Sequence, residues 1–120
     1  MSGPLLPYTP VVRAGPWLIV SGQVGLRDGT LVAGGVRAEA EQALYNLAAR
    51  LADNGAGLAD VAKTTVFMTD IADFGDINEV YASAFGDHLP ARSAVAVAAL
   101  PMGAAVEVEA WAYRPGLEAG

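Results

Sequence analysis

One positively charged residue stands at the start of a long uncharged stretch. Arg92 lies in PARSAVAVAALPMGAAVEVEA, residues 90–110, and the next charged side chain is Glu107. Removing a charge from water is costly unless the charge is paired, so an arginine in this setting is kept for a purpose. Its planar guanidinium could form an ion pair with a carboxylate of the protein, or it could bind the carboxylate of a ligand through two hydrogen bonds. The residues alone leave both interpretations open.

Glu107 is expected on a C-terminal strand over residues 105–113, and Arg92 is expected to open a strand over residues 92–98. The turn residues at 100–103 predict that the two strands form a hairpin. In such a hairpin Arg92 is too far from the turn to lie opposite Glu107, so the two would meet only through another chain or a bent sheet. Because strand residues alternate between faces, one face of the second strand carries Glu107, Glu109, Trp111 and Tyr113.

Other charged and polar residues offer weaker candidates for chemistry. The acidic series Asp70, Asp73, Asp76 and Glu79 recurs every three residues, which does not match the ligand spacing of a calcium-binding EF-hand loop. Helix capping and solvation explain this series better. His88 is the only histidine, and the chain has no cysteine. Because no metal-ligand set and no dinucleotide or phosphate-loop motif is present, the sequence predicts no metal and no cofactor.

The periodicity of apolar residues predicts the elements that must position these side chains. Residues 36–53 show apolar positions at steps of three and four, which indicates an amphipathic helix. A second helix is expected to begin at Asp73, which can cap its first turn, and to continue to Phe85. Further strands are predicted at residues 17–22, 30–33 and 61–68. This order predicts an α+β fold in which both helices pack on one face of the sheet.

The composition limits the classes of protein to which the chain can belong. With 120 residues, 53% of them hydrophobic and 17% charged, residues 1–120 are expected to form a single domain that covers some apolar surface by oligomerisation. A net charge of −6 with scattered Lys and Arg predicts that nucleic acid is not a partner. No apolar run is long enough for a membrane span, and residues 1–10 lack the pattern of a secretory signal. We therefore expect a cytoplasmic protein.

The region around Arg92 also resembles a known family. The motif Pro90-Ala-Arg-Ser93 followed by Ala99-Leu-Pro101 and Val106-Glu-Val-Glu-Ala110 is similar to the signature of the RidA/YjgF family of imine deaminases. Further segments that resemble the family in order are Pro7-Tyr8, Ser21-Gly-Gln23, Val61-Ala-Lys-Thr-Thr-Val-Phe67, Asp73-Phe74 and Asn78-Glu-Val-Tyr81. The resemblance extends from about residue 7 to residue 113.

This resemblance implies a chorismate-mutase-like fold, a mixed sheet with two helices on one face, assembled as a homotrimer with ligand clefts between subunits. It implies hydrolysis of imines and enamines of 2-oxo acids, such as 2-aminoacrylate, 2-iminopropanoate and 2-iminobutanoate, without a cofactor. By resemblance Arg92 binds the substrate carboxylate and Glu107 positions the attacking water. The remaining substrate-binding residues that it implies are Tyr8, Ser21, Gly22 and Asn78.

Three features depart from the family pattern. Ala94 occupies a position where some members have cysteine, so thiol-dependent chemistry is not expected here. Ala96 replaces a frequent acidic residue, and the turn at residues 27–29 is shorter than the usual loop. A non-catalytic sensor of 2-oxo acids stays an alternative function, as does a structural or chaperone-like trimer in which Arg92 only neutralises Glu107.

Overall fold

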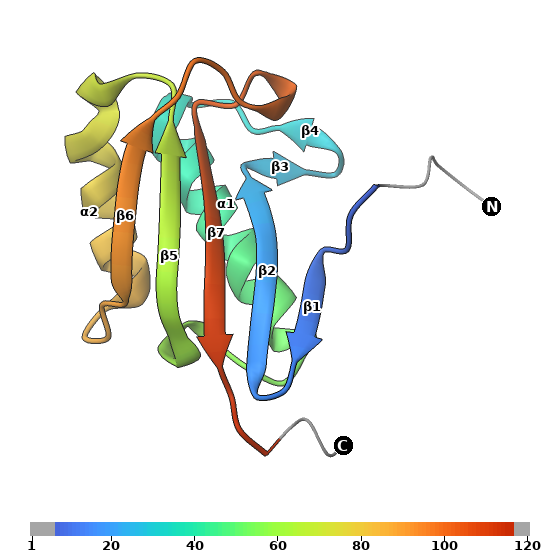
Figure 1. The fold of residues 1–120 in the computed structure, drawn as a ribbon. Coiled ribbons are helices and arrows are strands. Elements are labelled where there is room, and N and C mark those ends of the chain that lie inside the picture. Colours follow the sequence, from blue (N-terminus) through green and yellow to red (C-terminus); the bar gives the residue numbers. More distant parts are fainter. Residues whose placement is uncertain (1–6, 117–120) are drawn as a thin grey trace.

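The structure, a computed structural model, describes residues 7–116 as a sheet with two helices on one face (Figure 1). The five-stranded sheet has the order β1-β2-β7-β5-β6. Its strands are β1 (Val11–Ala14), β2 (Trp17–Val24), β7 (Val106–Tyr113), β5 (Val61–Met68) and β6 (Ala91–Ala96). The helices are α1 (Gly35–Ala52) and α2 (Phe74–Phe85), and a separate hairpin contains β3 (Leu26–Arg27) and β4 (Thr30–Leu31). The predicted α+β class is confirmed.

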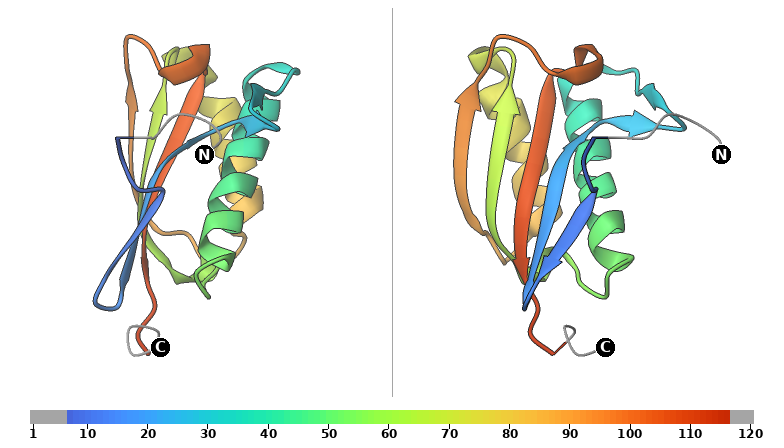
Figure 2. Two further views of the ribbon diagram at one scale, coloured as in Figure 1. Left: turned by 90° about the vertical axis from the view of Figure 1, so that its right-hand side faces the viewer. Right: turned by 45° about the vertical axis from the view of Figure 1, so that its right-hand side comes forward.

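The two helices cover one face of the sheet and leave the other face open (Figure 2). The apolar stripes expected from the sequence supply the buried layer between helices and sheet. From the helices this layer contains Ala40, Leu44, Leu47, Leu51, Ile77, Val80, Tyr81 and Phe85. From the sheet it contains Leu18, Val20, Val61, Val66, Met68, Val106, Val108, Ala110 and Ala112. The alternation predicted for residues 105–113 therefore holds in β7.

The predicted hairpin between the last two strands is wrong. β6 pairs in parallel with β5, and β7 lies between β2 and β5, antiparallel to both. Helix α2 connects β5 to β6, and a strand–helix–strand unit gives parallel pairing. The chain then crosses the end of β5 before it returns as β7. The backbone N–H of Val97 donates to Met68 O at 2.8 Å, and that of Thr69 donates to Ala105 O at 3.1 Å.

One predicted helix cap is wrong, one strand was not predicted, and one predicted turn is confirmed. Asp73 does not cap α2 through its side chain; Asp70 instead accepts a hydrogen bond from the Ala72 amide at 2.9 Å, at the start of a short 3-10 turn. Strand β1 has no counterpart among the predicted elements. Asp28 and Gly29 turn the β3–β4 hairpin with φ angles of 54° and 80°, as a tight hairpin turn requires.

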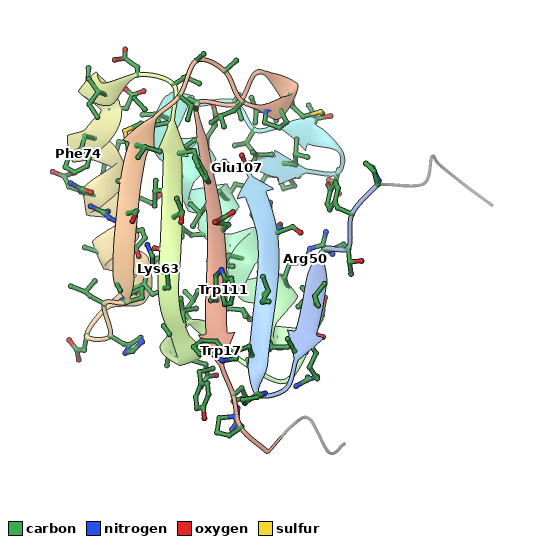
Figure 3. All side chains as sticks on the ribbon, in the orientation of Figure 1. Trp17, Arg50, Lys63, Phe74, Glu107 and Trp111 are labelled. Atoms are coloured by element: carbon green, nitrogen blue, oxygen red, sulfur yellow. The ribbon has the colours of Figure 1, made fainter. Side chains whose placement is uncertain are left out.

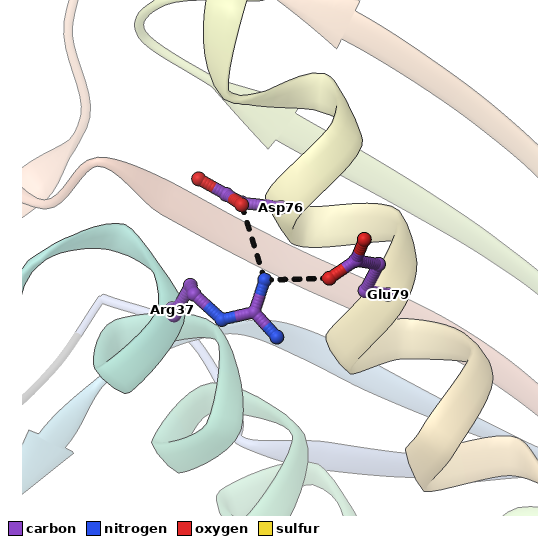
Figure 4. Close-up of polar contacts among 3 residues, drawn as sticks. All are labelled: Arg37, Asp76 and Glu79. Atoms are coloured by element: carbon purple, nitrogen blue, oxygen red, sulfur yellow. Dashed lines mark hydrogen bonds and ion pairs between the residues drawn. The ribbon is translucent and has the colours of Figure 1, made fainter.

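An exposed ion-pair cluster joins the two helices. Arg37 on α1 donates from one guanidinium nitrogen to Asp76 at 3.1 Å and to Glu79 at 2.8 Å, both on α2 (Figure 4). The hydrogen bonds that Arg37 donates to Glu79 and Asp76 raise its pKa above the ordinary value, and the negative charges of the two carboxylates add to this shift. Two members of the acidic series thus connect helices. No group of three or more His, Cys, Asp or Glu residues between positions 7 and 116 is arranged to hold a metal ion.

The open face of the sheet carries exposed apolar side chains. Glu107, Lys63 and Trp111 lie on this face (Figure 3). Val12, Val95, Trp111 and Tyr113 are each between 43% and 47% exposed. Trp17 packs its ring edge-on against Tyr113, with ring centres 5.0 Å apart. A contiguous apolar face of this kind is typical of a surface that another protein chain covers.

No helix within residues 7–116 is both long and apolar enough to cross a bilayer. The expected cytoplasmic location stays a prediction.

Candidate functional site

Arg92 is held by one amide and two aromatic rings of α2. Its Nη1 donates to Asn78 Oδ1 at 2.8 Å, and its guanidinium carbon lies 4.9 Å from the ring centre of Tyr81 and 5.6 Å from that of Phe74. None of the ion pairs formed within the described chain includes Arg92. No carboxylate within residues 7–116 pairs with Arg92, so this part of the chain gives no support to the structural ion-pair interpretation.

The Tyr81 ring is fixed from behind by a buried hydroxyl. Thr64 on β5 is fully buried, and its Oγ1 lies 2.6 Å from the Tyr81 hydroxyl oxygen. Burial raises the pKa of Tyr81, although the hydrogen bond with Thr64 and the charge of Arg92 act in the opposite direction. The ring beneath Arg92 is therefore a neutral phenol at neutral pH. The sequence analysis did not include Tyr81 among the site residues. A buried tyrosine usually has a hydrogen-bond partner for its hydroxyl, and that expectation could have drawn attention to it.

Glu107 lines a groove of about 590 Å³ whose walls come from the end of β2, from α1 and from the segment before β7. Tyr8 and Gly22 line the same groove, as predicted. Strand β7 pairs with β2 so that Glu107 lies opposite Val24, next to the irregularity in register between Val20 and Gln23. A side chain at Gly22 would collide with the Glu107 carboxylate, so only glycine permits the close approach seen here. The groove thus contains a carboxylate packed against bare backbone.

Partial burial raises the pKa of Glu107, and the negative charge of the neighbouring Glu109 raises it further. A carboxylate with a raised pKa is a stronger proton acceptor than a fully solvated one. Sequence reasoning identified Glu107 only from its motif. It missed the other residues that line the groove, among them Gln23, Arg50 and Met102.

Ser21 supports the groove and does not line it. Its Oγ donates to Thr9 O at 2.7 Å, and its backbone N–H donates to Pro10 O at 2.9 Å. These two bonds attach the segment that carries Tyr8 to strand β2. Tyr8 itself is 56% exposed, so its ring faces the groove and the solvent.

The predicted site residues therefore fall into two groups. We call Arg92, Asn78, Phe74 and Tyr81 the arginine half-site, and Tyr8, Gly22 and Glu107 the glutamate half-site. In the sheet, Arg92 pairs with the buried Thr64 and faces the helices, whereas Glu107 faces the open side. Their strands are two positions apart, about 10 Å, and the register adds about 10 Å along the strands. One chain does not bring the two half-sites together.

Each half-site supplies one part of a reaction on a small acid. The guanidinium has N–H groups not used by Asn78, and these can bind a carboxylate in a fork geometry. The groove carboxylate can accept a proton from a water molecule. Phe74 is 38% exposed at the edge of the arginine half-site, so a ligand bound to Arg92 would contact its ring.

The sequence and the fold are similar to those of known proteins. The sequence profile of the family described as endoribonuclease L-PSP matches residues 2–114. The 2-iminobutanoate/2-iminopropanoate deaminase of Mus musculus is 49% identical over 110 residues, which cover 90% of this chain and 82% of the mouse protein. The crystal structure of RidA from the Antarctic bacterium Psychrobacter has a TM-score of 0.86 at 38% identity and covers 92% of this chain and 91% of its own. The crystal structure of E. coli TdcF with bound serine also has a TM-score of 0.86 at 38% identity, and the match covers 93% of this chain and 91% of the TdcF chain.

Proposed function

Because this chain belongs to the endoribonuclease L-PSP family, which includes the RidA/YjgF imine deaminases, we propose that it hydrolyses imines of small 2-oxo acids to the oxo acid and ammonia. The substrates are 2-iminopropanoate, its enamine tautomer 2-aminoacrylate, and 2-iminobutanoate. The family profile spans nearly the whole chain, which supports a single domain over residues 1–120.

The observation that carries the proposal is the separation of two complementary half-sites. Arg92 is oriented by Asn78 and two rings but forms no ion pair with any carboxylate between residues 7 and 116. Glu107 has a raised pKa and lines a groove to which Arg92 of the same chain does not contribute. We assign Arg92 to the substrate carboxylate and Glu107 to the attacking water. The E. coli relative TdcF binds serine, a small molecule with a carboxylate, which fits this assignment.

A complete site then forms between neighbouring copies of the chain. The two half-sites occupy different surfaces, so one copy presents its arginine half-site to the glutamate half-site of the next. Such a head-to-tail contact closes into a ring when the rotation is regular. We propose a homotrimer with three such sites. The exposed apolar side chains of the open sheet face support burial of that face in the assembly.

In this site the chemistry needs positioning and one proton acceptor. Arg92 holds the substrate carboxylate and so places the imine carbon next to the water above Gly22. The water oxygen adds to the carbon of the protonated imine while Glu107 takes a proton from that water, which leaves a tetrahedral carbinolamine. Glu107 returns the proton to the nitrogen, the carbon–nitrogen bond breaks, and ammonia leaves. As the 2-oxo acid forms, the hydroxyl of the intermediate gives its proton to Glu107, which releases it to solvent.

The family description refers to a ribonuclease, but the charge of this chain favours a small-molecule substrate. RNA binding is driven by clustered positive side chains. The chain has a net charge of −6, with 7 Lys and Arg in total. The groove beside Glu107 includes one arginine, Arg50, together with the acidic Asp53. We therefore propose an imine substrate and not RNA.

The test is an assay in which an amino acid oxidase or a dehydratase generates the imine in situ and semicarbazide traps the unhydrolysed fraction. We expect the wild-type protein to accelerate formation of the 2-oxo acid. Arg92→Ala removes two charge-assisted hydrogen bonds of about 1.5–3 kcal/mol each, so kcat/KM should fall by about 10² to 10⁴. Arg13→Ala is the control, because Arg13 is exposed on β1 and lies outside both half-sites.

Two results would contradict the proposal. Saturable binding of 2-oxobutanoate by the wild-type protein without faster imine hydrolysis would identify a sensor instead of an enzyme. Full activity of Arg92→Ala would refute the role assigned to Arg92.

A further inference from the structure

A buried carboxylate that belongs to neither half-site lies next to the strand that carries Glu107. Glu39 on α1 is only 8% exposed, and its Oε1 accepts a hydrogen bond from the Ala105 amide at 2.8 Å. No ion pair found within residues 7–116 includes Glu39. Burying a carboxylate costs free energy. Because Glu39 binds one backbone amide, we interpret its role as holding that amide in position.

The hydrogen bonds of the Ala105 backbone hold the start of β7 in place. Ala105 immediately precedes β7 and is two residues before Glu107. Its carbonyl accepts from the Thr69 amide at 3.1 Å, so both of its backbone groups are tied, one to the end of β5 and one to Glu39. Loss of the Glu39 carboxylate would leave the Ala105 N–H without its partner at a half-buried position. The start of β7 would then have to move to reach water.

The backbone of Glu39 also contacts the other strand beside the groove. A Cβ at Gly25 would lie 2.8 Å from Glu39 Cα and 2.8 Å from its carbonyl oxygen, so the chain after β2 packs directly on α1 at this residue. Gly25 follows Val24, which pairs with Glu107. One residue of α1 therefore contacts the chain next to both strands of the glutamate half-site. Its side chain binds Ala105 just before β7, and its backbone packs against Gly25 just after β2.

We propose that Glu39 is a positioning residue for imine hydrolysis, which holds the start of β7 so that the Glu107 carboxylate lies against Gly22. This inference rests on the proposed function. The hydrogen-bonded oxygen of Glu39, and not its negative charge, performs the role. Glu39 touches neither substrate nor water and acts only through the backbone of β7.

The inference predicts a change in kcat and in the pH profile, not in substrate affinity. Arg92 sets the affinity for the carboxylate and lies on the opposite face of the sheet. A displacement of Glu107 by about 1 Å is enough to lower the rate up to about 100-fold. A displaced Glu107 would also be more exposed, so the acid limb of the kcat profile, where Glu107 loses its proton, would move to lower pH. The other titratable groups near Glu107 are Glu109 on the same strand, with Tyr8, Arg50 and Asp53 around the groove.

The experiment compares three variants at position 39 with a matched control. Glu39→Gln keeps a side-chain oxygen at the same reach, so kcat should stay within about twofold of wild type. Glu39→Ala removes the acceptor, and Glu39→Asp withdraws it by one methylene while keeping the charge. Both should lower kcat about 10- to 100-fold at unchanged KM, with the acid limb shifted to lower pH. Glu41→Ala, an exposed carboxylate on the same helix, should behave as wild type.

Two results would overturn the inference. In the first, folded Glu39→Asp keeps the wild-type kcat and its acid limb does not shift. In the second, kcat falls as much in Glu39→Gln as in Glu39→Asp. If Glu39→Ala does not fold, the Gln and Asp variants still decide. NMR titration of the Glu107 carboxyl in wild type and Glu39→Asp tests the positioning without catalysis, and an unchanged pKa there would also overturn it. Absence of imine hydrolysis in the wild-type protein would refute the proposed function while this titration still tests the position of Glu107.

Discussion

Substitution of Gly22 by alanine separates the stability of the protein from its proposed activity. A Cβ at position 22 would overlap the Glu107 carboxylate, which must then rotate away. An off-rotamer side chain costs about 0.5–1.5 kcal/mol, whereas alanine in place of glycine stabilises the folded chain by about 0.4–1 kcal/mol by restricting the unfolded state. These two effects nearly cancel, so the free energy of unfolding should change by less than about 1 kcal/mol. A carboxylate displaced by about 1 Å should lower kcat about 100-fold.

The assay measures kcat and KM for in situ generated 2-iminopropanoate, together with urea unfolding of the same sample. KM should change little, because Arg92 and Asn78 are untouched. Gly57→Ala is the control, since Gly57 has an extended backbone and no atom within 4 Å of a Cβ built there. A stable Gly22→Ala protein with wild-type kcat would refute the placement of the proton acceptor at Glu107.

Two further substitutions test the chemistry of each half-site. Glu107→Gln should lower kcat by about 10² to 10⁴ through loss of the proton acceptor. Folding raises the pKa of Glu107, so the ionised carboxylate lowers the stability of the folded wild-type protein at neutral pH. At pH 7 the Gln variant should therefore unfold at a higher urea concentration than wild type. The difference should disappear below about pH 4.3, where the carboxyl is protonated in both the folded and the unfolded state. Tyr81→Phe leaves the buried Thr64 hydroxyl unpaired, so the free energy of unfolding measured in urea should fall by about 1–3 kcal/mol. The ring stays under Arg92, so kcat/KM should stay within about twofold of wild type. A large fall in kcat/KM for Tyr81→Phe would mean that the hydroxyl itself acts on the substrate.

The local elements could be read from periodicity, but the pairing of strands could not. Residues 61–68 were predicted as a strand with the same bounds as β5, and the helix predicted over 36–53 matches α1 to within a residue at each end. These patterns are local, because each residue's face follows from its neighbours. The position of β7 between β2 and β5 depends on pairs of residues at least 38 positions apart in the sequence, and turn-forming residues at 100–103 favoured a hairpin that does not form. The short strand β1 has too few residues for a detectable period.

The residue types of the candidate site were predictable, but their arrangement was not. The motif around Arg92 and Glu107 identified the two groups, and strand alternation gave the face of Glu107. The face of Arg92 followed only from the parallel pairing of β6, which places it beside Thr64 and under α2. Glu39 gave no sequence signal, because a glutamate on an amphipathic helix is usually solvated. Its burial depends on where the start of β7 meets α1.

The most direct test of the central claim, that Arg92 of one chain and Glu107 of another form each site, is complementation between two inactive variants. Arg92→Ala and Glu107→Gln chains with different affinity tags are co-expressed, and oligomers that carry both tags are purified together with each parent. In a ring of three that contains both chains, exactly one of the three interfaces joins an intact arginine half-site to an intact glutamate half-site, whichever chain is in excess. The purified mixed oligomers should therefore recover about one third of the wild-type rate of imine hydrolysis. Activity no higher than that of the two parents, in oligomers shown to contain both chains, would contradict the account.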